Sequence, residues 1–189
     1  MNKKLSILIC SLASRYSVIQ TLLDALLPQI TDEIEVLINA DGGEKSTGEK
    51  RNELLDISTG DYIVFVDDDD TVSANYVQVI LDAILTAPDV IGIHLLMTTR
   101  GKNECRTYHS LKYRTWYDEP DPERPGRRRY FRNPNHLNPV KRAHALATGF
   151  PSKNRGEDHD YSQRLLPLLN TEVYIEQPIY YYLAGRVPN

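Results

Sequence analysis

Short apolar runs alternate with amphipathic segments through the first half of the chain, and this alternation limits the possible folds more than any other feature. The apolar runs predict buried strands at Leu5–Cys10, Ile34–Ile38, Asp61–Val66 and Val90–Met97. The segments between them space apolar residues as helices do, and predict helices at Tyr16–Ile30, Thr47–Ser58 and Ala74–Thr86. Because such strands are buried on both faces, we expect an α/β fold with a Rossmann-like, mostly parallel sheet flanked by helices.

The second half of the chain is less regular. Its patterns predict strands at Glu104–Tyr113, Glu172–Ile175 and Ile179–Leu183, an extended segment at His136–Arg142 and a helix at Glu157–Leu166. Residues Tyr117–Asn135 contain four prolines and five arginines, a composition that favours a mobile loop. No segment between the halves reads as a linker, so we expect a single domain over residues 1–189, with halves 1–99 and 100–189.

The formal net charge of −4 suggests no strong attraction to nucleic acid or anionic membranes. The two halves of the chain carry net charges of opposite sign. Residues 1–99 contain 6 Lys and Arg against 16 Asp and Glu, whereas residues 100–189 contain 16 against 10. Five of the basic residues lie between Arg124 and Arg132. The small net charge is therefore a cancellation and does not exclude an anionic partner.

Two cysteines, Cys10 and Cys105, provide neither a disulfide framework nor the spacing of a metal site. Reduced thiols of this kind favour a cytoplasmic location. The apolar run after Lys3 and Lys4 is short and closed by Arg15, so a first strand explains it better than a signal peptide. We expect no transmembrane segment, because no apolar window approaches the required length.

Four consecutive carboxylates, Asp67–Asp70, follow the strand predicted at Asp61–Val66. Ligands of parallel α/β sheets bind beyond the carboxyl ends of the strands, which is where these carboxylates lie. Mg²⁺ or Mn²⁺ would compensate their charge, because hard cations take oxygen ligands from one or two carboxylates and from phosphates. The alternative is a solvated acidic loop at the start of the next helix.

Five segments in order resemble the glycosyltransferases of family 2, which have the GT-A fold. They are Ser6–Ser11 with Arg15, Asn39–Gly43, Gly48–Asn52, Gly60–Asp70, and Gly149-Phe150 followed by Gly156–Asp158 and Arg164-Leu165. The resemblance covers about residues 5–166. It implies that residues 1–99 bind a nucleotide sugar and that an irregular, acceptor-side half at 100–189 carries the catalytic base.

The resemblance also implies a role for each matched residue. Asp158 would be the general base, with Glu157 beside it at the substrate. Asp41 would bind the nucleotide base and Arg51 the nucleotide, while Ser11 and Arg15 line the same substrate site. Asp67 and Asp68 would contact the ribose and the metal-bound donor, and Mn²⁺ or Mg²⁺ would be held by Asp69 and Asp67.

The reaction implied is a metal-dependent, inverting transfer of a sugar, for which a UDP-sugar is the expected donor. The acceptor hydroxyl would belong to a saccharide, or to a hydroxymethylated base in DNA. The arginines of the Arg124–Arg132 segment allow three interpretations: a solvated loop, a flap over the donor diphosphate, or a contact with a polyanionic acceptor.

Two other functions stay open from the sequence. A sugar nucleotidyltransferase could share the sheet and the acidic site, although no Gly-rich phosphate loop follows the first strand. A non-catalytic nucleotide-sugar-binding module is the other, because Ala40 and Leu12 depart from the family pattern. His136 and His159 could bind metal or phosphate, and Asp160 could replace Asp158 as the base.

Overall fold

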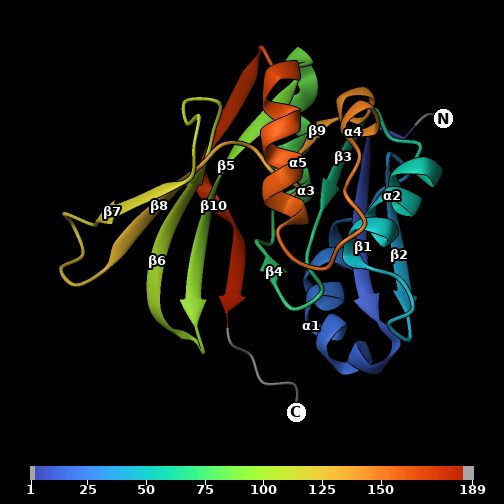
Figure 1. The fold of residues 1–189 in the computed structure, drawn as a ribbon, viewed down its shortest axis with the longest axis horizontal. Coiled ribbons are helices and arrows are strands. Elements are labelled where there is room, and N and C mark those ends of the chain that lie inside the picture. The colour runs from blue at the N-terminus through green and yellow to red at the C-terminus, as the bar shows by residue number, and fades with distance from the viewer. Residues whose placement is uncertain (1–2, 185–189) are drawn as a thin grey trace.

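The computed structural model of the protein describes residues 3–184 (Figure 1). Its strands are β1 (Leu5–Leu12), β2 (Ile34–Asp41), β3 (Tyr62–Phe65), β4 (Thr71–Val72), β5 (Val90–Thr99), β6 (Lys102–His109), β7 (Tyr117–Pro120), β8 (Arg128–Arg132), β9 (Val140–Lys141) and β10 (Glu172–Ala184). Its helices are α1 (Tyr16–Leu26), α2 (Thr47–Ile57), α3 (Tyr76–Ala83), α4 (Arg142–Thr148) and α5 (Glu157–Leu165). None of these helices is long and apolar enough to span a bilayer.

The strands form one mixed sheet in the order β2-β1-β3-β9-β5-β6-β8-β7, and β10 joins it by pairing with β5 and β4. Strands β1, β2 and β3 are parallel neighbours. The short strand β9 lies antiparallel between β3 and β5, so β5 runs in the same direction as the first three strands. The predicted α/β fold with a mostly parallel central sheet flanked by helices is therefore confirmed.

Two apolar layers cover the faces of the sheet, and the alternation of side chains along β1 separates them. Leu5, Ile7 and Ile9 pack with the apolar side chains of α1 and α3, whereas Leu8 packs on the other face with those of α2, α4 and α5. All four side chains are fully buried. Burial on both faces explains why this strand is a continuous apolar run in the sequence.

Helix α2 begins close to the loop that leads to α5. Ser46 accepts a hydrogen bond from the backbone N–H of Glu49, and the Glu49 carboxylate accepts one from the Ser46 N–H, which completes a capping box. The N–H of Gly48 donates to the carbonyl of Lys153 at 3.2 Å. A Cβ atom at Gly48 would overlap the Pro151 carbonyl oxygen, so only glycine permits this approach. The contact brings the start of α5 toward the carboxyl ends of the strands.

Several predicted boundaries are wrong. The helix predicted at Tyr16–Ile30 ends at Leu26, because Pro28 lies in a following 3₁₀ turn. Only Val140 and Lys141 of the extended segment form a strand, and helix α4 follows it directly. The two predicted C-terminal strands are one strand, β10, with register irregularities around Pro178.

The predicted mobile loop at Tyr117–Asn135 is also wrong over much of its length. It folds as the hairpin of β7 and β8, which projects away from β1 and β2 in Figure 1. The rings of Tyr117 and Phe131 stack across the hairpin with centroids 4.8 Å apart. Arg128 pairs with Asp118 and Arg129 with Glu119 across the same two strands. Cross-strand pairs of this kind stabilise a hairpin, and the proline content alone does not reveal them.

Candidate active site

The carboxyl ends of β1, β2 and β3 meet at one edge of the sheet, as the sequence predicts. A cavity of about 560 Å³, here called the first cavity, opens at this edge. Predicted site residues that line it are Ser11, Arg15, Asp67, Asp68 and Asp69, and residues not singled out from the sequence are Lys45, Lys50, Asn154 and Arg155. Asp41 lies at the end of β2 but is not part of the cavity wall.

Asp67 is the first of the four consecutive carboxylates and contacts two basic side chains. Its Oδ1 lies 3.2 Å from Nη2 of Arg51, and its Oδ2 lies 3.4 Å from Nε2 of His136. Burial raises the pKa of Asp67, but the contacts with His136 and Arg51 outweigh it and hold the pKa well below its ordinary value. Asp67 is therefore an anion at neutral pH, with about a third of its side chain exposed to the cavity.

Arg15 bridges the next two carboxylates. Its Nη2 lies 2.9 Å from Oδ1 of Asp68 and 2.9 Å from Oδ2 of Asp69. Asp68 is buried and also accepts a 2.6 Å hydrogen bond from the hydroxyl of Ser11, whereas the side chain of Asp69 is 41% exposed. Burial raises the pKa of Asp68 above its ordinary value, although Ser11 and Arg15 oppose the rise. Asp69 is thus the most accessible of these carboxylates.

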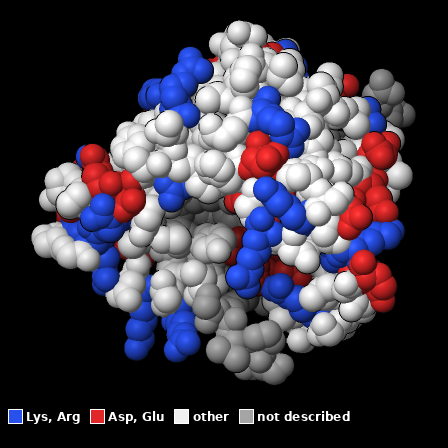
Figure 2. All heavy atoms as spheres, in the orientation of Figure 1, with Lys and Arg blue, Asp and Glu red and all other residues white. Residues whose placement is uncertain are grey.

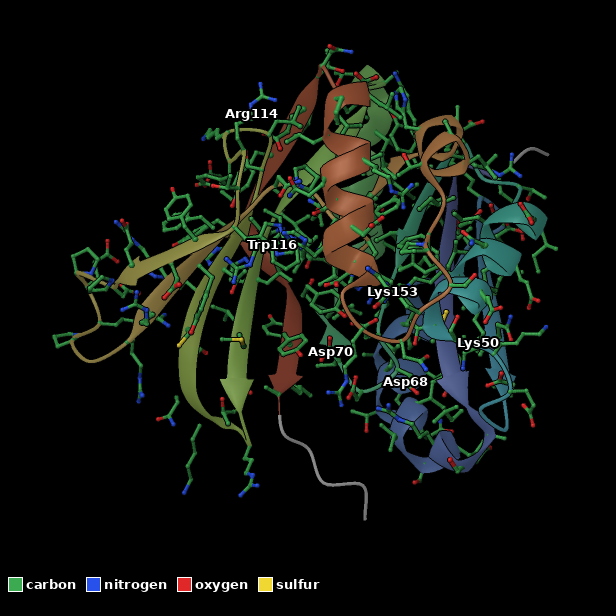
Figure 3. All side chains as sticks on the ribbon, viewed as in Figure 1. Lys50, Asp68, Asp70, Arg114, Trp116 and Lys153 are labelled. Atoms are coloured by element: carbon green, nitrogen blue, oxygen red, sulfur yellow. The ribbon has the colours of Figure 1, made fainter. Side chains whose placement is uncertain are left out.

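Asp70 turns away from the first cavity into the protein. It accepts a 2.7 Å hydrogen bond from the Tyr180 hydroxyl and a 2.8 Å bond from the backbone N–H of Leu183. Burial raises the pKa of Asp70 to about 8, and the charge of Asp67 adds to the rise. The Tyr180 hydroxyl also accepts a hydrogen bond from the N–H of Asp67 at 3.1 Å. Strand β10 therefore holds both ends of the acidic segment Asp67–Asp70 in place. Figure 3 labels both residues: Asp68 lies beside β1, and Asp70 lies toward β10.

Lys50 connects the ends of β1 and β2. Its Nζ donates to the Ser11 carbonyl at 2.7 Å and to Oδ1 of Asp41 at 2.8 Å, and only 4% of the residue is exposed. The hydrogen bond from Lys50, with one from the N–H of Lys45, lowers the pKa of Asp41 to about 2. The sequence holds a signal for Lys50, because it lies four residues before the buried Leu54 on the same helix face. A lysine on a buried face needs an acidic partner.

Arg51 joins the acidic segment to helix α5. Its Nη1 lies 2.9 Å from Oε1 of Glu157, while Nη2 reaches Asp67. The guanidinium also packs over the rings of Phe65 and Phe150, at 5.5 and 5.2 Å from their centroids. Arg51 is 3% exposed, so this bridge is part of the protein interior. The predicted contact of Arg51 with the nucleotide stays a prediction.

A second cavity, of about 570 Å³, lies between α5 and the strands β5, β6, β8 and β10. Figure 2 shows the hollow near the middle of this face, with Lys and Arg side chains along one side of it. Its wall includes Asp158, Glu157, Arg132, Trp116, Tyr130, His136 and Tyr182. Asp67, Asn154 and Arg155 line both cavities, so the two cavities are adjacent.

Of the two acidic side chains considered as a base, Asp158 is the one in the second cavity. No ion pair among residues 3–184 engages Asp158, whereas Asp160 pairs with Nε of Arg164 at 2.6 Å. His159 packs edge-on against Trp116, with ring centroids 4.9 Å apart, and is not in the wall of either cavity. The geometry therefore favours Asp158 over Asp160 as the carboxylate available for proton transfer.

The arginines of the Arg124–Arg132 segment do not cover the first cavity. Within the described residues, Arg124 pairs with Glu104, while Arg127 donates to the side-chain oxygen of Asn103 at 2.7 Å. Arg128 and Arg129 are engaged by the acids of β7. Of these arginines, Arg132 lines the second cavity and none lines the first. Because none of these arginines lines the first cavity, the structure does not support the interpretation as a flap over a donor diphosphate there.

The carboxylates of Asp67 and Asp69 suit a divalent cation whose remaining ligands are phosphate oxygens and water. Both line the first cavity, with a third or more of each side chain exposed. Residues 3–184 contain no group of three or more His, Cys, Asp or Glu side chains arranged to hold a metal. Mg²⁺ and Mn²⁺ do not need one, because water and phosphate oxygens complete their coordination. His136 is engaged by Asp67 and faces the second cavity.

His109 gives the fold a predictable response to acid. It is 3% exposed, its Nδ1 lies 3.1 Å from the Asn138 side-chain oxygen, and burial lowers its pKa to about 3. An unfolded histidine titrates near 6.5, so below that pH the unfolded chain binds a proton that the native protein does not. The free energy of unfolding should therefore fall by about 2 kcal/mol between pH 7 and pH 5 from this residue alone.

Urea unfolding of the His109→Gln variant at pH 7 and pH 5 measures this effect. Glutamine keeps a hydrogen-bond donor for Asn138 and cannot be protonated. Its free energy of unfolding should depend on pH less than that of the unaltered protein, by about 2 kcal/mol over this range. Equal pH dependence in the two proteins would show that the pKa of His109 is the same in the native and the unfolded protein.

Known proteins share this architecture. A search of curated proteins gave no match. The solved structure of TarS from S. aureus aligns with a TM-score of 0.69 and 15% identity, over 96% of this chain and 37% of TarS. The structure of TarS residues 1–349 in complex with UDP-GlcNAc aligns with a TM-score of 0.71 and 13% identity, over 97% of this chain and 59% of that one. The complex of the same segment with UDP aligns with a TM-score of 0.69 and 16% identity, over 96% of this chain and 60% of that one.

These structural likenesses show a common fold, and the chain spans 37% of TarS and about 60% of its 1–349 segment. Sequence comparison adds the family. The model of Glycosyl transferase family 2 matches residues 47–150, from the start of α2 to the second residue after α4, which is more than half of the 189 residues. The matched range includes Arg51 and the acidic segment Asp67–Asp70. The chain belongs to glycosyl transferase family 2.

Proposed function

We propose that the protein transfers a sugar from a nucleotide-sugar donor to an acceptor hydroxyl, with the donor in the first cavity and the acceptor in the second. The observation that carries this proposal is the shared wall of the two cavities. Asp67 lines both, and Asp158 lies in the second cavity on the far side of that wall. A donor and an acceptor bound in adjacent cavities would meet there, as a direct transfer requires.

The donor we infer is a UDP-sugar. TarS, which shares the fold, has been solved with UDP and with UDP-GlcNAc. In this chain, Arg15, Lys45 and Arg155 provide positive charge around the first cavity for a diphosphate. Lys50 lines the first cavity beside Ser11 and would donate a hydrogen bond to a nucleotide base, and Asp41, which lies outside the cavity wall, would hold Lys50 in place.

Asp69, with Asp67 beside it, would hold Mn²⁺ or Mg²⁺. When bound, such an ion neutralises negative charge that develops on a leaving diphosphate. Arg15 contacts Oδ2 of Asp69 and also Asp68, so Oδ1 of Asp69 is the oxygen left to bind the ion. Arg15 lines the first cavity and would contact a phosphate oxygen of the donor directly, because its guanidinium is a good match for phosphate.

Asp158 would act as the general base in an inverting reaction. Its carboxylate accepts the proton of the acceptor hydroxyl while that oxygen attacks the anomeric carbon and the bond to the diphosphate breaks. One displacement at that carbon inverts its configuration. Glu157 is already engaged by Arg51, which fixes the first turn of α5 and hence the position of Asp158.

A saccharide is the acceptor that we favour over a hydroxymethylated base in DNA. The aromatic side chains of Trp116, Tyr130 and Tyr182 in the wall of the second cavity suit the apolar faces of a sugar. A DNA backbone would have to compete with the carboxylates that already pair with the arginines of the β7–β8 hairpin.

Calorimetric titration with UDP, GDP and CDP, each with and without Mn²⁺, tests the donor site. We expect UDP to bind, with higher affinity when Mn²⁺ is present. Asp69→Asn should remove the Mn²⁺-dependent gain, whereas Asp160→Asn, which changes an acid paired with Arg164, should keep it. Failure to bind any nucleotide, together with no release of nucleotide from UDP-sugars, would refute the proposed function.

A further inference from the structure

Arg132 differs from the arginines that precede it in the β7–β8 hairpin. Arg124, Arg128 and Arg129 each pair with a carboxylate. Among residues 3–184, Arg132 has no carboxylate within ion-pair distance and donates only from Nη1, to the carbonyls of Tyr117 at 2.9 Å and Phe131 at 3.0 Å. Its Nε and Nη2 are left to bind something else.

Two aromatic rings hold the guanidinium of Arg132. The centroid of Trp116 lies 4.9 Å from its central carbon and that of Tyr130 lies 5.3 Å away. Stacking of this kind fixes the plane of an arginine without using its N–H groups. All three side chains line the second cavity, and Figure 3 shows Trp116 beside the N-terminal end of α5.

A half-buried cation without a counter-ion is unfavourable. Burial lowers the pKa of Arg132, although the negative charges of Asp118 and Asp158 oppose that change. An anion bound in the second cavity would offset the lost hydration, and the open edge of a fixed guanidinium matches a phosphate or carboxylate with two parallel hydrogen bonds. Arg155, in the wall of the same cavity, adds a second positive charge.

We propose that the acceptor carries an anionic oxygen group, a phosphate or a carboxylate, which Arg132 binds in the second cavity. This inference rests on the proposed function, because it assigns the hydroxyl compound that Asp158 would deprotonate. The negative charge of this group repels that of Asp158. The anionic group must therefore lie on the Arg132 side of the cavity, and the reacting hydroxyl on the α5 side. The acceptor class is then an acidic or phosphorylated saccharide.

Trp116 is the single tryptophan of the chain, so its fluorescence reports on Arg132 without a label. The protein is first saturated with UDP, which occupies the first cavity, and the UDP affinity is recorded. Inorganic phosphate, dimethyl phosphate or acetate is then titrated at constant ionic strength. These three probes represent a phosphate monoester, a phosphodiester and a carboxylate. We expect a saturable change with at least one of them.

Arg132→Met should weaken that binding about tenfold or more, because charge-assisted hydrogen bonds are lost. Arg132→Lys keeps the charge but not the planar edge, so it should bind with intermediate affinity. The matched control is Arg128→Met, which removes an arginine of the same strand that pairs with Asp118 and lies outside both cavities. It should bind the probe like the unaltered protein.

The inference is overturned if none of the probes binds, or if Arg132→Met binds them with unchanged affinity. An equal loss in Arg132→Met and Arg128→Met also overturns it, because that pattern indicates a diffuse basic surface such as a DNA-binding protein presents. UDP affinity separates the two proposals. If UDP fails to bind while the probes bind through Arg132, the proposed function fails and the anion site stands.

Discussion

Replacing Asp158 with asparagine should lower the turnover number by a factor of about 10² to 10⁴, the usual contribution of a positioned general base. Asparagine has nearly the same shape and cannot accept the proton of the acceptor hydroxyl. The measurement is the release of UDP from the UDP-sugar that the unaltered protein uses. Because Asp158 lies outside the first cavity, the affinity for UDP should stay within about twofold, less than the effect of one hydrogen bond.

Asp160→Asn is the matched control for this prediction. Asp160 lies two residues further along α5, is 38% exposed and pairs with Arg164, so its loss should change turnover little. Loss of turnover in Asp160→Asn with turnover retained in Asp158→Asn would reverse the assignment of the base. Equal turnover in all three proteins would favour a non-catalytic role for the second cavity.

The fold could be predicted where local sequence determines it. Leu5–Leu12 is a strand buried on both faces, and such strands are nearly continuous apolar runs. The hairpin of β7 and β8 could not be found this way, because its stability comes from pairs such as Tyr117 with Phe131. Those contacts join residues that only the sheet register brings together, and the prolines around them favour a loop.

The site shows the same division between local and long-range information. The position of Asp67–Asp70 after a strand predicts a ligand-binding edge, and the first cavity lies there. The difference between the exposed Asp69 and the buried Asp70 depends on Tyr180, which is 110 residues away from Asp70. The sequence did not identify Trp116 as a site residue, because the residues next to it in the sequence do not indicate that Arg132 stacks on its ring.

Arg51→Met should destabilise the protein by about 3–5 kcal/mol, the effect expected when one partner of a buried ion pair is removed. The side chains of Arg51 and Glu157 are only 4% and 8% exposed, and Arg51 also neutralises Asp67. The variant leaves the buried Glu157 and the partly exposed Asp67 without their shared cation. Urea unfolding at pH 7 measures the loss.

Lys4→Met is the control for this change, because Lys4 and Glu33 form an exposed pair whose loss should cost less than about 1 kcal/mol. The double variant Arg51→Met/Glu157→Gln should recover part of the loss, since one of the two unpaired charges is then removed. The same double variant tests how α5 is held. If the Arg51–Glu157 contact positions Asp158, turnover stays low in the double variant although part of the stability returns, whereas with a purely stabilising contact turnover would recover together with stability.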